Sequence, residues 1–122
     1  MIDHTALYVS DQATAKRFYS EALKPLGYEL MFEAGDWLGF GDAGGMPNLG
    51  VVRRDRAGGG HVALSAQDRA TVDAFYEAAM AAGAKDNGPP GVREHYHANY
   101  YAAFVIDPDG HNIEMVCHAR EG

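Results

Sequence analysis

The fold is decided by two stretches that repeat one another, HTALYVSDQATAKRFYSEA at residues 4–22 and HVALSAQDRATVDAFYEAA at residues 61–79. Aligned without a gap, they share nine identities in 19 positions, beginning with His4 opposite His61. An unrelated pair with this alanine-rich composition should share only about one or two. The sequence therefore predicts that the chain arose by duplication.

Each copy begins with alternating apolar and polar residues, which is typical of a strand, and then changes to helical spacing. A glycine follows each helical stretch, Gly27 in the first copy and Gly83 in the second, as suits a helix C-terminal cap. Three β-type runs follow each helix, at 28–34, 37–41 and 49–54, and then at 92–98, 100–107 and 112–118. Each half is thus predicted to be a βαβββ module.

The two modules are expected to form one α+β domain over residues 1–122. Module 1 covers about 1–56 and module 2 about 61–118, with the glycine-rich segment 56–60 between them. A chain of this length is a single compact unit that buries roughly two thirds of its surface.

Composition excludes several classes of partner. The chain has 10 basic and 17 acidic residues, a net charge of −7 and no basic run, so nucleic acid and anionic membranes are poor partners. Cys117 is the only cysteine, which indicates a reducing compartment. No apolar run is long enough to span a membrane, and Met1 to His4 do not resemble a signal peptide, so we expect a cytoplasmic protein.

The stretch DPDGHNIEM, residues 107–115, places a carboxylate on a strand that should be half buried. Asp107 to Gly110 form a predicted turn, because proline and glycine occupy its favoured positions. In the strand that follows, Ile113 and its alternate neighbours form the apolar face and Glu114 lies on the other. An anion there is unfavourable unless a positive group meets it.

Two histidines are the candidates to meet it. His4 and His61 occupy the same position in the two copies, and a pseudo-twofold arrangement would bring equivalent strands and equal faces together. With Glu114 they form a two-histidine, one-carboxylate set, which leaves open positions on a divalent metal ion. The sequence predicts such a site, with Zn, Fe, Mn or Ni as candidate ions.

These features together resemble the vicinal oxygen chelate superfamily, which includes glyoxalase I, the fosfomycin- and bleomycin-resistance proteins and the extradiol dioxygenases. The resemblance runs from Asp3-His4 through the duplication to Glu114. It implies a curved mixed sheet that forms a cup, with the helices on the convex side. It also implies that His4, His61 and Glu114 hold one metal ion, which chelates two adjacent substrate oxygens and stabilises an oxyanion. Many short members build their cups from two chains, so we expect a homodimer.

The sequence departs from two branches of this superfamily. Matching 48–51 to 112–115 places Gly50 where glyoxalase I has a fourth ligand, a glutamate. Phe104 stands near the position where extradiol dioxygenases carry a catalytic tyrosine. The sequence matches neither branch fully.

Other polar residues near the last hairpin are candidates for catalysis. His97, Tyr100 and Tyr101 could supply an acid, a base or a substrate contact, and Glu114 could also act as a base. Arg53, Arg54 and Arg56 are interpreted as a solvated strand end rather than an anion site, and His111 and His118 as surface residues.

The first functional hypothesis is a metal-dependent enzyme of lyase, isomerase or dioxygenase type that acts on a small substrate with adjacent oxygens. The alternative is a metal-free protein of bleomycin-resistance type that sequesters a small molecule.

Overall fold

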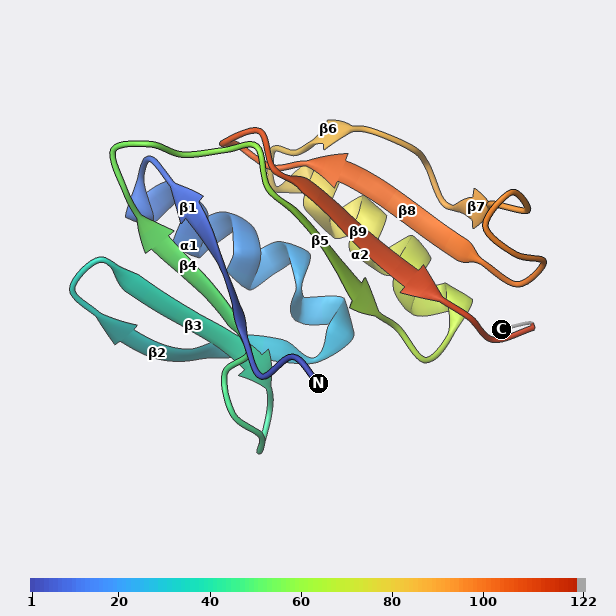
Figure 1. The fold of residues 1–122 in the computed structure, drawn as a ribbon, viewed down its shortest axis with the longest axis horizontal. Helices are drawn as coiled ribbons and strands as arrows, with labels where there is room; N and C mark the ends of the chain where they lie inside the picture. Colours follow the sequence, from blue (N-terminus) through green and yellow to red (C-terminus); the bar gives the residue numbers. More distant parts are fainter. Residues whose placement is uncertain (121–122) are drawn as a thin grey trace.

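The computed structural model describes residues 1–120 and contains strands and helices in the predicted order. Along the chain these are β1 (Thr5–Val9), α1 (Gln12–Ala22), the short 3-10 helix η1 (Lys24–Leu26), β2 (Tyr28–Ala34), β3 (Trp37–Asp42), β4 (Leu49–Arg53), β5 (His61–Ser65), α2 (Arg69–Ala81), β6 (Lys85–Asp86), β7 (Gly91–Val92), β8 (Tyr101–Ile106) and β9 (Asn112–Cys117). Each repeated stretch forms a strand and the helix after it (Figure 1).

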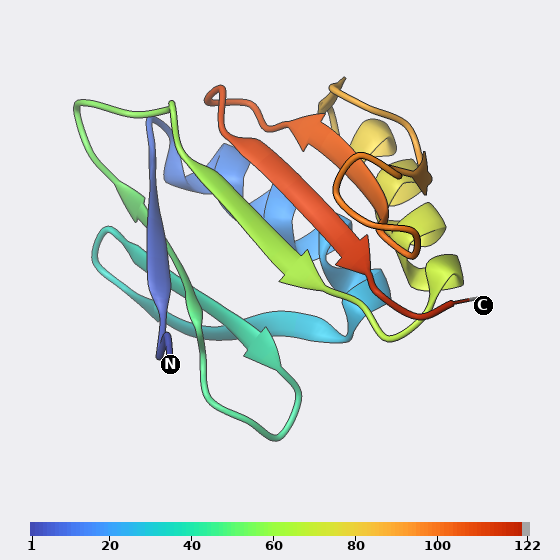
Figure 2. The same cartoon turned by 45° about the vertical axis from the view of Figure 1, so that its right-hand side comes forward.

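The strands form two mixed sheets, one from each module. The first sheet has the order β1-β4-β3-β2, and the second has β5-β9-β8-β6 with β7 also paired to β8. The first and last strands of each module are parallel, β1 with β4 and β5 with β9, and the other pairs are antiparallel. Figures 1 and 2 show both helices on the same side of the sheets. The predicted α+β fold of two modules is confirmed.

A single core joins the modules between the sheets and the helices. Phe18 of α1 and Phe75 of α2 occupy equivalent positions of the duplication and are 1% and 0% exposed. Leu7 and Val9 turn their side chains into the same core, as alternation along β1 predicts. Both copies therefore bury the face that their repeated pattern marks as apolar.

Both helices begin at an aspartate N-cap. Asp11 accepts a hydrogen bond from the backbone N–H of Thr14, and Asp68 accepts one from Thr71. The two threonine hydroxyls donate to the same carboxylates, at 2.5 and 2.6 Å. These hydrogen bonds, the hydroxyl contact first, lower the pKa of both aspartates from 3.8.

The structure differs from the predicted elements in two places. Helix α1 ends at Ala22, because Pro25 opens the separate turn η1, and Gly27 caps that turn at a φ of 87°. The strand predicted at 92–98 is wrong: pairing is limited to β6 and β7, two residues each, and a turn segment follows. After β7 the backbone turns, because the Tyr96 N–H donates to the Arg93 carbonyl at 3.0 Å and the Tyr100 N–H to the His97 carbonyl at 3.2 Å.

The turn between β8 and β9 attaches module 2 to module 1. The Tyr19 hydroxyl of α1 donates to Asp107, and the Ser10 backbone N–H donates to Asp109 at 3.0 Å. Burial, followed by the Asp107 charge, raises the pKa of Tyr19 well above 10. We refer to Asp107, Asp109 and His111 as the inter-module clasp.

His111 is the buried member of the clasp, and the surface position predicted for it is wrong. It is 2% exposed. Its Nδ1 accepts the Gly60 backbone N–H at 3.0 Å, so Nε2 carries the proton and donates to the Tyr8 carbonyl at 2.6 Å. One imidazole thereby holds the linker and β1 together.

Candidate metal centre

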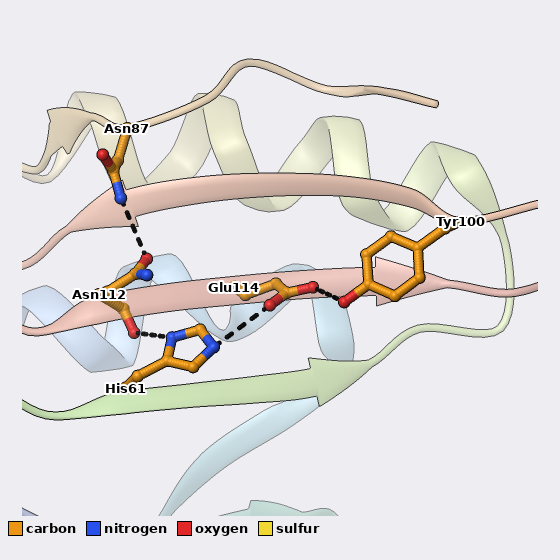
Figure 3. A network of polar contacts seen from close by, with 5 residues as sticks. All are labelled: His61, Asn87, Tyr100, Asn112 and Glu114. Atoms are coloured by element: carbon orange, nitrogen blue, oxygen red, sulfur yellow. Dashed lines mark hydrogen bonds and ion pairs between the residues drawn. The ribbon is translucent and has the colours of Figure 1, made fainter. Parts of the chain in front are cut away.

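Strands β5 and β9 place His61 and Glu114 on the sheet face away from the helices. The parallel register sets His61 beside Asn112 and Ala63 beside Glu114. Side chains two residues apart on one strand share a face, so His61 and Glu114 project together. His61 Nε2 lies 3.4 Å from Glu114 Oε1 (Figure 3).

Glu114 is 3% exposed and has a polar partner on each oxygen. His61 approaches Oε1, and the Tyr100 hydroxyl donates a hydrogen bond to Oε2. Burial raises the pKa of Tyr100 to about 12, with further contributions from its hydrogen bond to Glu114 and from the charge of that carboxylate. Tyr100 is therefore a hydrogen-bond donor to Glu114 throughout the physiological range.

A backbone carbonyl fixes the ring of His61. Its Nδ1 lies 2.9 Å from the Asn112 carbonyl, which can only accept, so Nδ1 carries a proton. In the neutral ring Nε2 then presents its lone pair toward Glu114. The Asn87 side-chain amide donates to Asn112 at 3.2 Å, which adds a further contact behind the ring. Metal-binding histidines are commonly oriented in this way.

His4 does not join these two residues within one chain. It precedes β1 in the other sheet, is exposed, and has its Nδ1 2.8 Å from Asp3 Oδ1. His4 and His61 line the same groove, of about 380 Å³. Among residues 1–120, however, no three histidine, cysteine or acidic side chains come close enough to hold a metal ion. Within residues 1–120 of one chain, the structure therefore brings His61 and Glu114 together but does not bring His4 to them.

The predicted catalytic candidates Tyr101 and His97 take different positions. Tyr101 lies on the helix side of β8, where its hydroxyl donates to Asp73 of α2 at 2.5 Å, so the structure does not bring it to Glu114. His97 lies in the segment before β8, and its ring centroid is 5.4 Å from that of Tyr100. Tyr100, the third of the candidates, is the tyrosine that contacts Glu114.

His97 belongs to a group of aromatic rings beside the candidate centre. Its Nδ1 accepts the Asn99 N–H at 3.1 Å, so its Nε2 donates to Nδ1 of exposed His118 at 2.8 Å. Tyr100 meets both histidine rings edge to face. The group therefore contacts the Glu114 carboxylate through Tyr100.

The protein consists of two βαβββ modules. An imidazole and a carboxylate lie next to each other on the sheet face away from the helices, and they form a candidate ligand site. The family model described as the Glyoxalase/Bleomycin resistance protein/Dioxygenase superfamily matches residues 1–115. The chain belongs to this superfamily.

Solved structures support the same fold. A glyoxalase/bleomycin resistance protein from Albidiferax ferrireducens T118 is 26% identical, with a TM-score of 0.80 over 93% of this chain and 95% of that one. A glyoxalase/bleomycin resistance protein/dioxygenase family enzyme from Burkholderia phytofirmans PsJN is 15% identical, with a TM-score of 0.73 over 97% of this chain and 98% of that one. A lactoylglutathione lyase from Agrobacterium tumefaciens is 23% identical, with a TM-score of 0.69 over 96% and 92%. The last two show a common fold alone. The comparison with curated proteins found no match.

Within residues 1–120, neither helix is long and apolar enough to cross a membrane.

Proposed function

We propose that the protein is a metal-dependent enzyme that acts on a small substrate with two adjacent oxygens, and that His61 and Glu114 are two of its metal ligands. The observation that carries the proposal is the 3.4 Å separation of His61 Nε2 and Glu114 Oε1. Two ligand atoms bound at about 2.0–2.1 Å with tetrahedral angles are about 3.3 Å apart. With Nδ1 protonated, a neutral His61 ring would have the lone pair of Nε2 available for the ion.

The chain's own residues suit this role. The Asn112 carbonyl keeps the His61 ring in one tautomer, and Tyr100 holds the Glu114 carboxylate. Glu114 would hold the ion, and its carboxylate could also accept a substrate proton. When bound, a divalent ion would supply a Lewis acid that polarises the substrate oxygens and stabilises a developing oxyanion.

For the third ligand we propose His4 of the partner subunit in a homodimer. Each chain supplies an adjacent pair in module 2 and an exposed histidine in module 1. Two chains related by a twofold axis would exchange these parts reciprocally, because such an interface presents the same surface twice. Each dimer would then contain two shared sites.

Metal content tests the ligand assignment. Elemental analysis of untagged protein should find one divalent ion per chain, and His61→Ala or Glu114→Gln should remove most of it. His95→Ala, which changes an exposed histidine, is the matched control and should keep the metal. At a hundredfold excess over its dissociation constant, the ion should raise the free energy of unfolding by about 3 kcal/mol, and a chelator should remove that gain. Metal-free wild type insensitive to added Zn, Fe, Mn or Ni would contradict the proposal.

Mixing two inactive variants tests whether the site is shared. Chains with His4→Ala and chains with Glu114→Gln should each bind little metal. In a mixed dimer, one site would combine the intact His4 of one chain with the intact Glu114 of the other. Unfolding and refolding the mixture should therefore restore metal to about half of the sites in mixed dimers. No restoration, with mixed dimers present by mass spectrometry, would place all ligands within one chain.

The second candidate function is metal-free sequestration of a small molecule. A small apolar pocket on module 1 favours it, because its lining includes Phe32, Trp37 and Pro47. Tight binding of an aromatic compound without turnover, unchanged by Glu114→Gln, would support this candidate over the enzyme.

A further inference from the structure

The face of the four-stranded sheet away from the helices carries two contrasting rows of side chains. The register aligns one row of Tyr8, Val52 and Trp37, and a second row of Ala6, Gly50 and Gly39. The rows are two residues apart along each strand, or about 7 Å. The second row is made of the smallest residues, so it forms a trough beside the aromatic row.

Trp37 forms one wall of this trough. A Cβ at Gly50 would lie 3.3 Å from Cζ3 of Trp37, so the indole leans over the glycine. The resulting pocket has a volume of about 120 Å³, and its lining includes His4, Phe32, Pro47 and Gly39. A cavity of roughly 150 Å³ admits benzene, so this smaller pocket can take one edge of a small ring.

A cation lies at the far edge of Trp37. The Arg54 guanidinium is 5.9 Å from the centroid of the Trp37 ring and 5.6 Å from that of Tyr8. No carboxylate of residues 1–120 lies within 4.0 Å of it, and its one hydrogen bond within the described chain is to the Arg53 carbonyl. Arg53, by contrast, pairs with Asp55 at 3.0 Å. Arg54 is half-buried at the strand end, with its guanidinium against two aromatic rings.

We propose that this face is the binding site for a small aromatic carboxylate, with the ring in the trough and the carboxylate on Arg54. A guanidinium presents paired N–H donors that match a carboxylate, and stacking on aromatic rings leaves those donors free. The row that contains Tyr8 and Trp37, the two rings beside Arg54, is about 7 Å from the trough along the strands. Arg54 does not line the pocket itself, so the carboxylate would extend out of the trough toward it and form a charge-assisted hydrogen bond of about 2.8 Å.

This inference deepens the proposed function, because it names the substrate class. His4 lines the pocket and is also the proposed third ligand. A bound ring would thus place one edge toward the metal and its carboxylate away from it. The assignment as substrate rests on the proposed function, whereas the binding of the carboxylate to Arg54 does not.

Trp37 is the only tryptophan, so its fluorescence reports directly on this site. Benzoate and its neutral isostere benzamide should be titrated into chelator-treated protein, with Arg54→Gln, Arg54→Lys and Arg53→Gln as variants. We expect benzoate to bind wild type at least tenfold more tightly than benzamide. Arg54→Gln should abolish this preference, Arg54→Lys should keep part of it, and Arg53→Gln should leave it unchanged.

Equal affinity of wild type for benzoate and benzamide would overturn the inference, as would an equal loss in Arg53→Gln and Arg54→Gln. Circular dichroism of each variant checks its fold, and Arg54→Lys keeps the test informative if Arg54→Gln is unstable. Because the titration is performed without metal, its outcome is independent of the metal assays. Benzoate binding in a protein that takes up no metal would therefore refute the proposed enzyme and leave the anion site standing.

Discussion

Replacing His111 with alanine should destabilise the protein by about 2–3 kcal/mol. The substitution removes the acceptor of the Gly60 N–H and one donor to the Tyr8 carbonyl. A buried group left without its partner costs about 1–3 kcal/mol. The Tyr8 carbonyl retains a second donor, the Gly58 N–H at 3.2 Å. Losing the hydrogen bond from His111 to this carbonyl should therefore cost an amount at the low end of that range.

The expected shift in melting temperature follows from the length of the chain. Unfolding entropy is about 2.1 cal/mol/K per residue, so for this chain each kcal/mol corresponds to about 4 °C. His111→Ala should therefore melt about 8–12 °C below wild type. His111→Gln retains an amide donor and a carbonyl acceptor, and should recover part of the loss.

Urea unfolding followed by circular dichroism measures the free energy directly. His95→Ala is the control, because His95 is exposed, and it should change stability by no more than about 0.5 kcal/mol. Hydrogen exchange at the Gly60 amide should also accelerate in His111→Ala. A His111→Ala protein as stable as the control would refute the structural role assigned to this histidine.

Three further predictions concern titration and the core. Above pH 10 the unfolded chain releases the Tyr100 proton, whereas the folded chain holds it until about pH 12. The free energy of unfolding should therefore fall between pH 10 and 12, and it should fall less in Tyr100→Phe. Urea unfolding at pH 9 and 11 checks this. Asp68 has a lowered pKa in the folded chain. Its contribution to the free energy of unfolding is therefore present above pH 3.8 and is lost as the pH falls through its folded-state pKa. Asp68→Asn should flatten this acid dependence of stability between pH 5 and 2. Phe75→Ala should lose about 3–5 kcal/mol in the same assay, and Phe32→Ala, at a side chain 49% exposed, should lose far less.

The repeated modules could be predicted because their signals are local. Alternation and helical spacing both lie within one stretch of chain, and each appears twice. The strand expected at 92–98 failed because its aromatic residues indicated a strand while the backbone there forms turns, closed by hydrogen bonds from Tyr96 to Arg93 and from Tyr100 to His97. Aromatic content alone therefore gave the wrong element there.

The candidate site could be predicted only in part. His61 and Glu114 were predicted as partners, because strand alternation and the repeat place them on one face. The choice between Tyr100 and Tyr101 depends on where β8 begins, since a shift of one residue reverses the face. The role of His111 depends on contact with β1, about a hundred residues away, and nothing in its immediate sequence indicates that partner.

The inter-module clasp also bears on how this protein could change its ligand. On β1 and the linker, the clasp binds backbone groups: the Tyr8 carbonyl, the Ser10 N–H and the Gly60 N–H. A mutation of the Tyr8 side chain therefore leaves the docking of the modules intact while altering the aromatic row beneath Arg54. Selection for a new ligand can act on that row without loosening the junction, so the specificity of the face is free to evolve separately from the assembly of the fold.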